Sequence, residues 1–146
     1  MGLFDKVLGG GSTNKLSEQE GLAGIALAAI ASDGMITQEE AAGLGTTLSR
    51  MKLYAGMSDR DVNKVFEKLI KLARSEGVDT LLRLSSDAVR PELKQTAFAV
   101  AADLLMADGD VAAEEKRFLE KIQRSLGVED DAALKIVEVM SIKNRG

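Results

Sequence analysis

Cysteine and histidine are both absent from this 146-residue chain. Without cysteine it can form neither a disulfide nor a thiolate metal site, so a reducing compartment is permitted. Without histidine, the Ser-His-Asp and Cys-His arrangements of nucleophilic enzymes and the common zinc sites are excluded as well. The remaining chemistry belongs to carboxylates, Lys, Ser, Thr and one Tyr. Any bound metal would therefore be held by oxygen atoms.

Aromatic residues and net positive charge are also scarce. Phe, Trp and Tyr make up 3% of the residues, and the formal net charge is -4. A nucleic-acid surface normally needs clustered basic residues and often stacking rings, so we expect no nucleic-acid partner. As binding partners, cations or basic proteins fit the negative net charge of this chain better than a nucleic acid does.

Long apolar runs are lacking too. The best run, residues 22–31, is far shorter than the roughly 20 residues that cross a bilayer. Residues 1–11 do not contain the apolar core of a signal peptide. We therefore expect a cytoplasmic protein, with a peripheral position at the inner face of the membrane as the alternative.

The chain divides into a short N-terminal segment and one domain. Residues 9–14 read Gly-Gly-Gly-Ser-Thr-Asn, and such a stretch loses much entropy on ordering without burying apolar groups. Residues 1–16 are therefore predicted to be a flexible segment with a Gly-rich linker. Residues 17–146 are long enough for one hydrophobic core. We predict a single domain there.

Helix boundaries follow from capping and turn residues. Ser17 and Glu20 have the spacing of a capping box, in which each side chain binds the other residue's backbone N–H. Thr37 and Glu40 repeat this spacing. Pro91 suits the first turn of a helix, and no segment alternates with period two, so we predict an all-α fold. Helices are expected over about residues 17–32, from 37 onward, from 58 or 59 to at least 73, and over 79–84, 91–107, 114–126 and 130–142.

A shift of 75 residues, from Asp33 to Asp108, lays one half of the chain on the other. Apolar, turn and acidic positions all coincide. This register predicts two related helix-turn-helix units, with about seven helices packed about a pseudo-two-fold axis. The matched positions include Ala29-Ile30 with Leu104-Leu105, Asp33-Gly34 with Asp108-Gly109, Ile36 with Val111, Glu39-Glu40 with Glu114-Glu115, and Leu44 with Leu119.

The acidic turns resemble half of a calcium-binding loop. The string Asp-Gly-x-Ile/Val-x-x-x-Glu matches the second half of an EF-hand loop. The first half of the loop does not match, because its positions 1 and 3 lack a side-chain oxygen. They are Ala29 and Ala31 in one copy, and Leu104 and Met106 in the other. A hard divalent cation takes about six or more oxygens. A site here would therefore need both units to come together.

The same acids also have a structural explanation. Asp-Gly is a common turn, and a Glu in the first helical turn gains about 0.3–1 kcal/mol from the helix dipole. Glu40 also fits its capping box. In the second copy Ala112 replaces Thr37, so by this reasoning capping leaves Glu115 unexplained. The second turn is therefore the stronger sequence evidence for a functional acid.

Two glycines and one acid within the expected helices lead to further predictions. Gly43 and Gly45 lie inside the second helix, where each costs about 1 kcal/mol relative to Ala unless close packing needs it. We predict a close helix crossing there. Asp103, an acid within a helix, is expected to face solvent.

From about Ser17 to Met140, the chain resembles the TerB family of tellurite-resistance-associated proteins. The resemblance is carried by residues 31–40, ASDGMITQEE, and residues 106–116, MADGDVAAEEK. It implies an all-helical, duplicated fold whose acidic residues form a metal-associated site, here for Ca²⁺, Mg²⁺ or Mn²⁺. By this resemblance the metal-site positions are Asp33, Glu40, Asp108 and Glu115, followed by Glu39 and Glu114.

Two functions remain open. The first is a non-enzymatic, acidic metal-binding adaptor of a tellurite-resistance or stress-response system, with protein partners that include a membrane-associated stress complex. The second is a protein-protein interaction domain, as found beside J-domain co-chaperones, in which the acids serve only as helix caps. A carboxylate hydrolase is a third and less favoured reading, because a catalytic pair needs a concave pocket. We expect no enzyme activity and identify no small-molecule substrate.

Overall fold

The structure is a computed structural model that describes residues 15–31, 36–107 and 109–145. Within these ranges it contains seven α-helices and no strand, which confirms the all-α prediction. None of these helices is long and apolar enough to span a bilayer. The helices are α2 (Glu18–Ile30), α3 (Gln38–Ser49), α4 (Asp59–Glu76), α5 (Val78–Ala88), α6 (Lys94–Leu105), α7 (Ala113–Leu126) and α8 (Asp130–Lys143), with 3-10 turns η2 (Lys52–Tyr54) and η3 (Pro91–Leu93).

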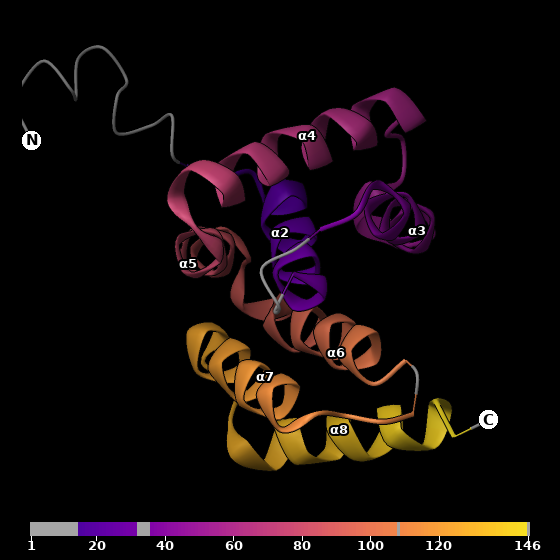
Figure 1. Cartoon of the computed structure of the whole chain (residues 1–146), viewed down its shortest axis with the longest axis vertical. Helices are drawn as coiled ribbons and strands as arrows, with labels where there is room; N and C mark the ends of the chain where they lie inside the picture. The colour runs from indigo at the N-terminus through magenta and orange to yellow at the C-terminus, as the bar shows by residue number, and fades with distance from the viewer. Residues whose placement is uncertain (1–14, 32–35, 108, 146) are drawn as a thin grey trace, which may run out of the picture.

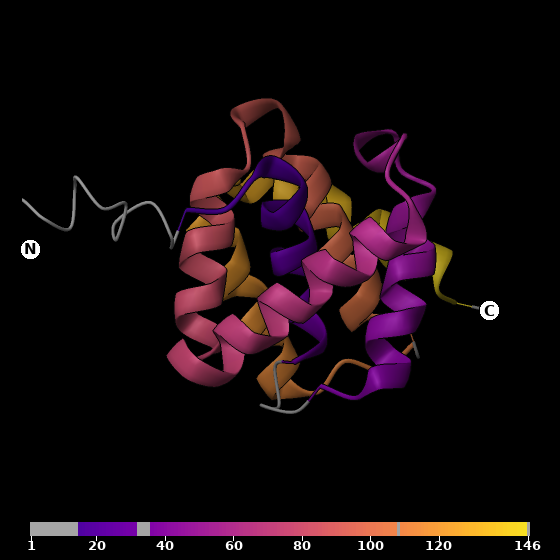
Figure 2. The ribbon, with the colours of Figure 1, turned by 90° about the horizontal axis from the view of Figure 1, so that it is seen from above.

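Helix α2 forms the centre of the fold. Residues 21–29 are buried without interruption, since the segment is apolar on every side and such a helix belongs inside a protein. In Figure 1, α3, α4 and α5 surround α2, α6 crosses below it, and α7 and α8 form the end of the molecule opposite α4. Figure 2 shows the same arrangement from above. Every helix contributes to one continuous set of buried apolar side chains.

Hydrogen bonds in the first turns confirm the predicted helix starts. Ser17 Oγ accepts from the Glu20 N–H at 3.1 Å, and the Glu20 carboxylate accepts from the Ser17 N–H at 2.8 Å. Thr37 and Glu40 form the same reciprocal pair at the start of α3. Ser58 caps α4 in the same way. These caps satisfy backbone donors that the helix itself leaves unpaired.

Between α4 and α6 the predicted boundaries were wrong. α5 continues four residues beyond the predicted end at Leu84, because Ser85 and Ser86 are buried against neighbouring helices. Pro91 opens the 3-10 turn η3, and α6 begins at Lys94. The helix predicted to start at Pro91 therefore starts three residues later. The pseudo-two-fold axis stays a prediction, and the predicted flexible segment lies outside the described ranges up to residue 14.

Helices α2 and α5 cross at close range. A Cβ atom on Gly21 would lie 2.8 Å from the Cβ of Ala88 and 2.9 Å from the carbonyl oxygen of Ser85. A Cβ on Gly24 would overlap the side chain of Ser85. Two glycines spaced three residues apart thus present bare backbone to α5, and this allows the two helices to approach closely.

Gly43 and Gly45 do not provide the close crossing that was predicted for them. A Cβ on Gly43 would meet no atom of the described neighbouring residues within 4 Å, and one on Gly45 would lie 3.5 Å from the Phe66 ring, an ordinary contact. The prediction was wrong because a glycine within a helix reflects close packing only where the neighbouring atoms leave no room for a Cβ, and both positions have that room.

Glu20 gives the fold a testable pH dependence. Burial by itself would raise the pKa of this carboxyl. The Ser17 N–H and the Lys68 ammonium, whose Nζ lies 2.9 Å from Glu20 Oε2, outweigh burial and leave the pKa below its ordinary value of 4.5. Glu20 therefore binds a proton more readily in the unfolded chain than in the folded one. The stabilisation from Glu20 is complete above pH 4.5 and is lost as the pH falls through the lowered, folded-state pKa.

We expect Glu20→Gln to lower the free energy of unfolding by about 1 kcal/mol at pH 7, since it removes a charged partner of Lys68. The loss should shrink at pH 3, below the ordinary pKa of 4.5, because there the unfolded chain binds a proton at Glu20 more readily than the native protein does, and this proton uptake already lowers the native stability. Urea denaturation at the two pH values measures the difference. Glu67→Gln, an exposed change on α4, is the matched control. An equal loss for Glu20→Gln at both pH values would contradict the assignment.

Candidate functional site

Glu40 and Glu115 occupy the same position, the third residue of α3 and of α7. Glu40 Oε1 accepts from the Thr37 N–H at 3.1 Å and from the Thr37 hydroxyl at 3.0 Å. Glu115 Oε1 accepts from the Ala112 N–H at 3.0 Å. The carboxylate half of the capping box therefore persists in the second copy without a Thr. The inference that capping leaves Glu115 unexplained was wrong, because this half needs only the backbone N–H of residue 112.

The two helix starts open onto one cavity of about 350 Å³. Glu40 reaches it from α3, and Glu114 and Glu115 reach it from α7. The apolar lining comes from the last residues of α2 and α6, at positions that match between the copies. In Figure 2 the segments that lead into α3 and α7 lie along the same edge of the molecule. Tertiary packing thus brings acids of the two copies together.

The charge at this cavity is negative. Each helix N-terminus acts as roughly half a positive charge, so the two together offset only about one of the three carboxylates. The hydrogen bonds of Glu40 and Glu115 use Oε1, and the described residues provide no partner for the other oxygen of either side chain. Those two Oε2 atoms can therefore serve as ligands without loss of the helix caps.

The described carboxylates do not by themselves form a complete metal site. No group of three acids among the described residues has the arrangement that holds a metal ion. Asp33 and Asp108, the turn acids of the predicted set, lie outside the described residues. Glu39 is exposed and does not line the cavity. Of the predicted positions, Glu40, Glu114 and Glu115 are the ones that the structure brings together.

Asp103 does not simply face solvent, as its sequence context predicted. Its Oδ1 accepts from Lys143 Nζ at 3.1 Å and from Asn144 Nδ2 at 2.9 Å, which ties the end of α8 to α6. A Cβ on Gly109 would lie 3.7 Å from the Asn144 carbonyl oxygen. The C-terminal end of α8 therefore packs beside the second acidic turn. No short-range pattern could have indicated this, since about 40 residues separate the partners.

A groove between α7 and α8 was also missed by the sequence reasoning. Its signal was present, because the outward face of α8 carries large apolar side chains where a surface helix normally carries polar ones.

One comparison with known proteins identifies a family. The sequence model of the family described as tellurite resistance protein TerB matches residues 19–136. No curated protein and no solved structure matches the chain. The matched range includes both helix starts and all three carboxylates that line the cavity.

Proposed function

Since the chain belongs to the tellurite resistance protein TerB family, which indicates a function related to tellurite resistance, we propose that it is a non-enzymatic adaptor that binds a divalent cation. The proposal places it in a tellurite-resistance or stress-response system, with protein partners. The observation that supports it most directly is the cavity shared by Glu40, Glu114 and Glu115. These acids come from helices that are far apart in the sequence.

The cavity suits a hard cation in the chemistry of its ligands. Ca²⁺, Mg²⁺ and Mn²⁺ prefer oxygen, and carboxylates are the strongest oxygen ligands that a protein offers. Glu40 and Glu115 are held in place through their caps, so little rotamer entropy remains to be lost on binding. Asp33 and Asp108, which precede the two helices in the sequence, would complete the oxygen set. A bound cation would relieve the repulsion among the carboxylates and join the start of α3 to the start of α7.

We expect the double variant Glu40→Gln/Glu115→Gln to weaken cation binding at least about tenfold, because affinity for these ions depends on the ligand charge. Glutamine is also found at this position of capping boxes, so the variant should keep its helix caps. Calorimetric titration of the full chain with Ca²⁺, Mg²⁺ and Mn²⁺ measures Kd. Glu39→Gln, which removes one carboxylate charge of α3 outside the cavity, should leave Kd unchanged.

Two results would reject the cation site: no binding by the native chain, or binding that survives the double change. Asp33→Asn/Asp108→Asn extends the test to the turns and should also weaken binding. The melting temperature is a second readout. A ligand that binds only the folded state stabilises it by about 2.7 kcal/mol at a hundredfold excess over Kd, so the native Tm should rise with cation and the Glu40→Gln/Glu115→Gln Tm should not.

A second function, an interaction domain in which the acids are only caps, is favoured by the hydrogen bonds that Glu40 and Glu115 make to their own helix starts. Under this alternative, neither titration nor melting responds to cations. Glu40→Ala and Glu115→Ala would still destabilise the fold through the lost caps, by about 1 kcal/mol each.

A further inference from the structure

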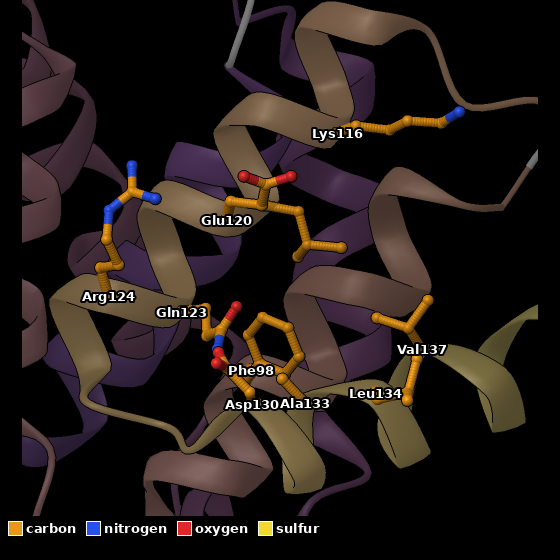
Figure 3. Close-up of a pocket in the computed structure, with 10 residues that line it drawn as sticks. Phe98, Lys116, Glu120, Gln123, Arg124, Asp130, Ala133, Leu134 and Val137 are labelled. Atoms are coloured by element: carbon orange, nitrogen blue, oxygen red, sulfur yellow. The ribbon is translucent and has the colours of Figure 1, made fainter.

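A groove of about 600 Å³ separates α7 from α8, at the end of the molecule opposite α4 (Figure 1). Phe98 of α6 forms its floor, and Leu134 and Val137 of α8 form an apolar wall (Figure 3). The opposite wall, on α7, is charged along its rim. The groove is distinct from the acidic cavity, since no described residue lines both.

The outward face of α8 lacks a partner within the chain. The large apolar side chains most exposed among the described residues are all on this helix: Leu134 at 59%, Val139 at 57% and Ile142 at 61%. Apolar residues gathered on one exposed helix beside an apolar groove are typical of an interaction site.

The charges at the groove and on α8 are complementary. Lys116, Glu120 and Arg124 follow one another at intervals of four residues, so they share a face of α7 and run along the groove as plus, minus, plus (Figure 3). On α8 the exposed residues Asp131, Lys135 and Glu138, at intervals of four and three, read minus, plus, minus.

None of these six side chains forms an ion pair within the described chain. Both triplets read the same in either direction, so an α8 helix laid against the α7 rim can match all three charges whichever way it runs.

We propose that the chain forms a symmetric homodimer in which α8 of each copy lies in the groove between α7 and α8 of the other. Each copy supplies both the groove and the helix that fits it, and two-fold symmetry makes every contact twice. Burial of the exposed side chains Leu134 and Ile142 provides the affinity. The charged rim sets the register and excludes other surfaces.

Sedimentation velocity of the full chain over a range of concentrations tests this proposal. The native protein should reach twice its 15.5 kDa mass. Lys116→Glu/Arg124→Glu makes the α7 rim wholly acidic, and Asp131→Lys/Glu138→Lys makes the α8 triplet wholly basic. Each double variant alone should dimerise at least tenfold more weakly, because its reversed charges face native ones of the same sign.

A one-to-one mixture of the two double variants distinguishes a lost interface from a lost fold. In the mixed dimer one contact pairs the acidic α7 rim with the basic α8 triplet, and the other pairs two native surfaces. The mixture should therefore recover a dimer at least as tight as the native one, and a single chain with all four changes should do so too. Arg60→Glu/Lys64→Glu, on exposed positions of α4, is the matched control and should remain dimeric.

Three results would overturn the homodimer. One is a native chain that stays monomeric at every concentration, which would leave the groove for another partner or for the N-terminal segment. Another is a native dimer that neither double variant weakens. The third is a mixture of the two variants that remains monomeric.

Discussion

Phe98→Ala is expected to lower the free energy of unfolding by about 3–5 kcal/mol. Phe98 is 1% exposed and is among the largest fully buried side chains of the described chain. It projects from α6 between α7 and α8 (Figure 3), so truncation leaves a void where three helices meet. A domain of this size is typically stable by about 5–15 kcal/mol. Phe98→Ala would therefore remove a large part of the total free energy of unfolding.

Urea denaturation followed by far-UV circular dichroism measures this loss. Phe118→Ala is the matched control, because Phe118 lies on α7 and is only partly buried, and it should cost clearly less. Phe98→Leu, which keeps most of the volume, should cost less than about 1.5 kcal/mol. Equal losses for Phe98→Ala and Phe118→Ala would show that the junction of α6, α7 and α8 is not packed as described.

Gly21→Ala is expected to destabilise the protein by about 1–3 kcal/mol through overpacking, although the same change in an exposed helix adds about 1 kcal/mol of stability. The added Cβ would lie 2.9 Å from the carbonyl oxygen of Ser85 and 2.8 Å from the Cβ of Ala88. Neither atom can move without the helix that carries it, so α2 and α5 must separate. Because α2 is the centre of the core, that separation should disturb packing throughout the fold.

Gly43→Ala is the control with the opposite expected sign. Its helix interior position is open, with nothing within 4 Å among the described neighbours, so alanine should stabilise the protein by up to about 1 kcal/mol. Denaturation midpoints of the two variants, measured side by side, compare the same chemical change in two surroundings. A stabilising Gly21→Ala would be incompatible with the α2–α5 contact.

The helix starts show what sequence patterns capture well. Ser17 and Thr37 bind a carboxylate three residues ahead, and these bonds form whatever else the chain packs against. The two acidic motifs likewise sufficed to identify the TerB family. Patterns failed where the decisive neighbour is distant, as at Asp103, whose partners lie about 40 residues away.

The candidate site was likewise predicted in part from the sequence and decided in part by tertiary packing. Glu40 and Glu115 were selected from the sequence because the two motifs align, but their meeting with Glu114 at one cavity depends on how α3 and α7 pack around the ends of α2 and α6. The groove of α7 and α8 depends on packing in the same way.

The sequence alone determined the helical class, the capped starts of the helices and the absence of thiol and imidazole chemistry. These follow from residue types and from bonds that span no more than about four residues. Tertiary structure alone decided that Gly21 and not Gly43 lies at a close crossing, that α5 extends past Leu84, and that acids from two motifs share a cavity. Such features depend on which surfaces the burial of the whole core brings together, and no local segment contains that information.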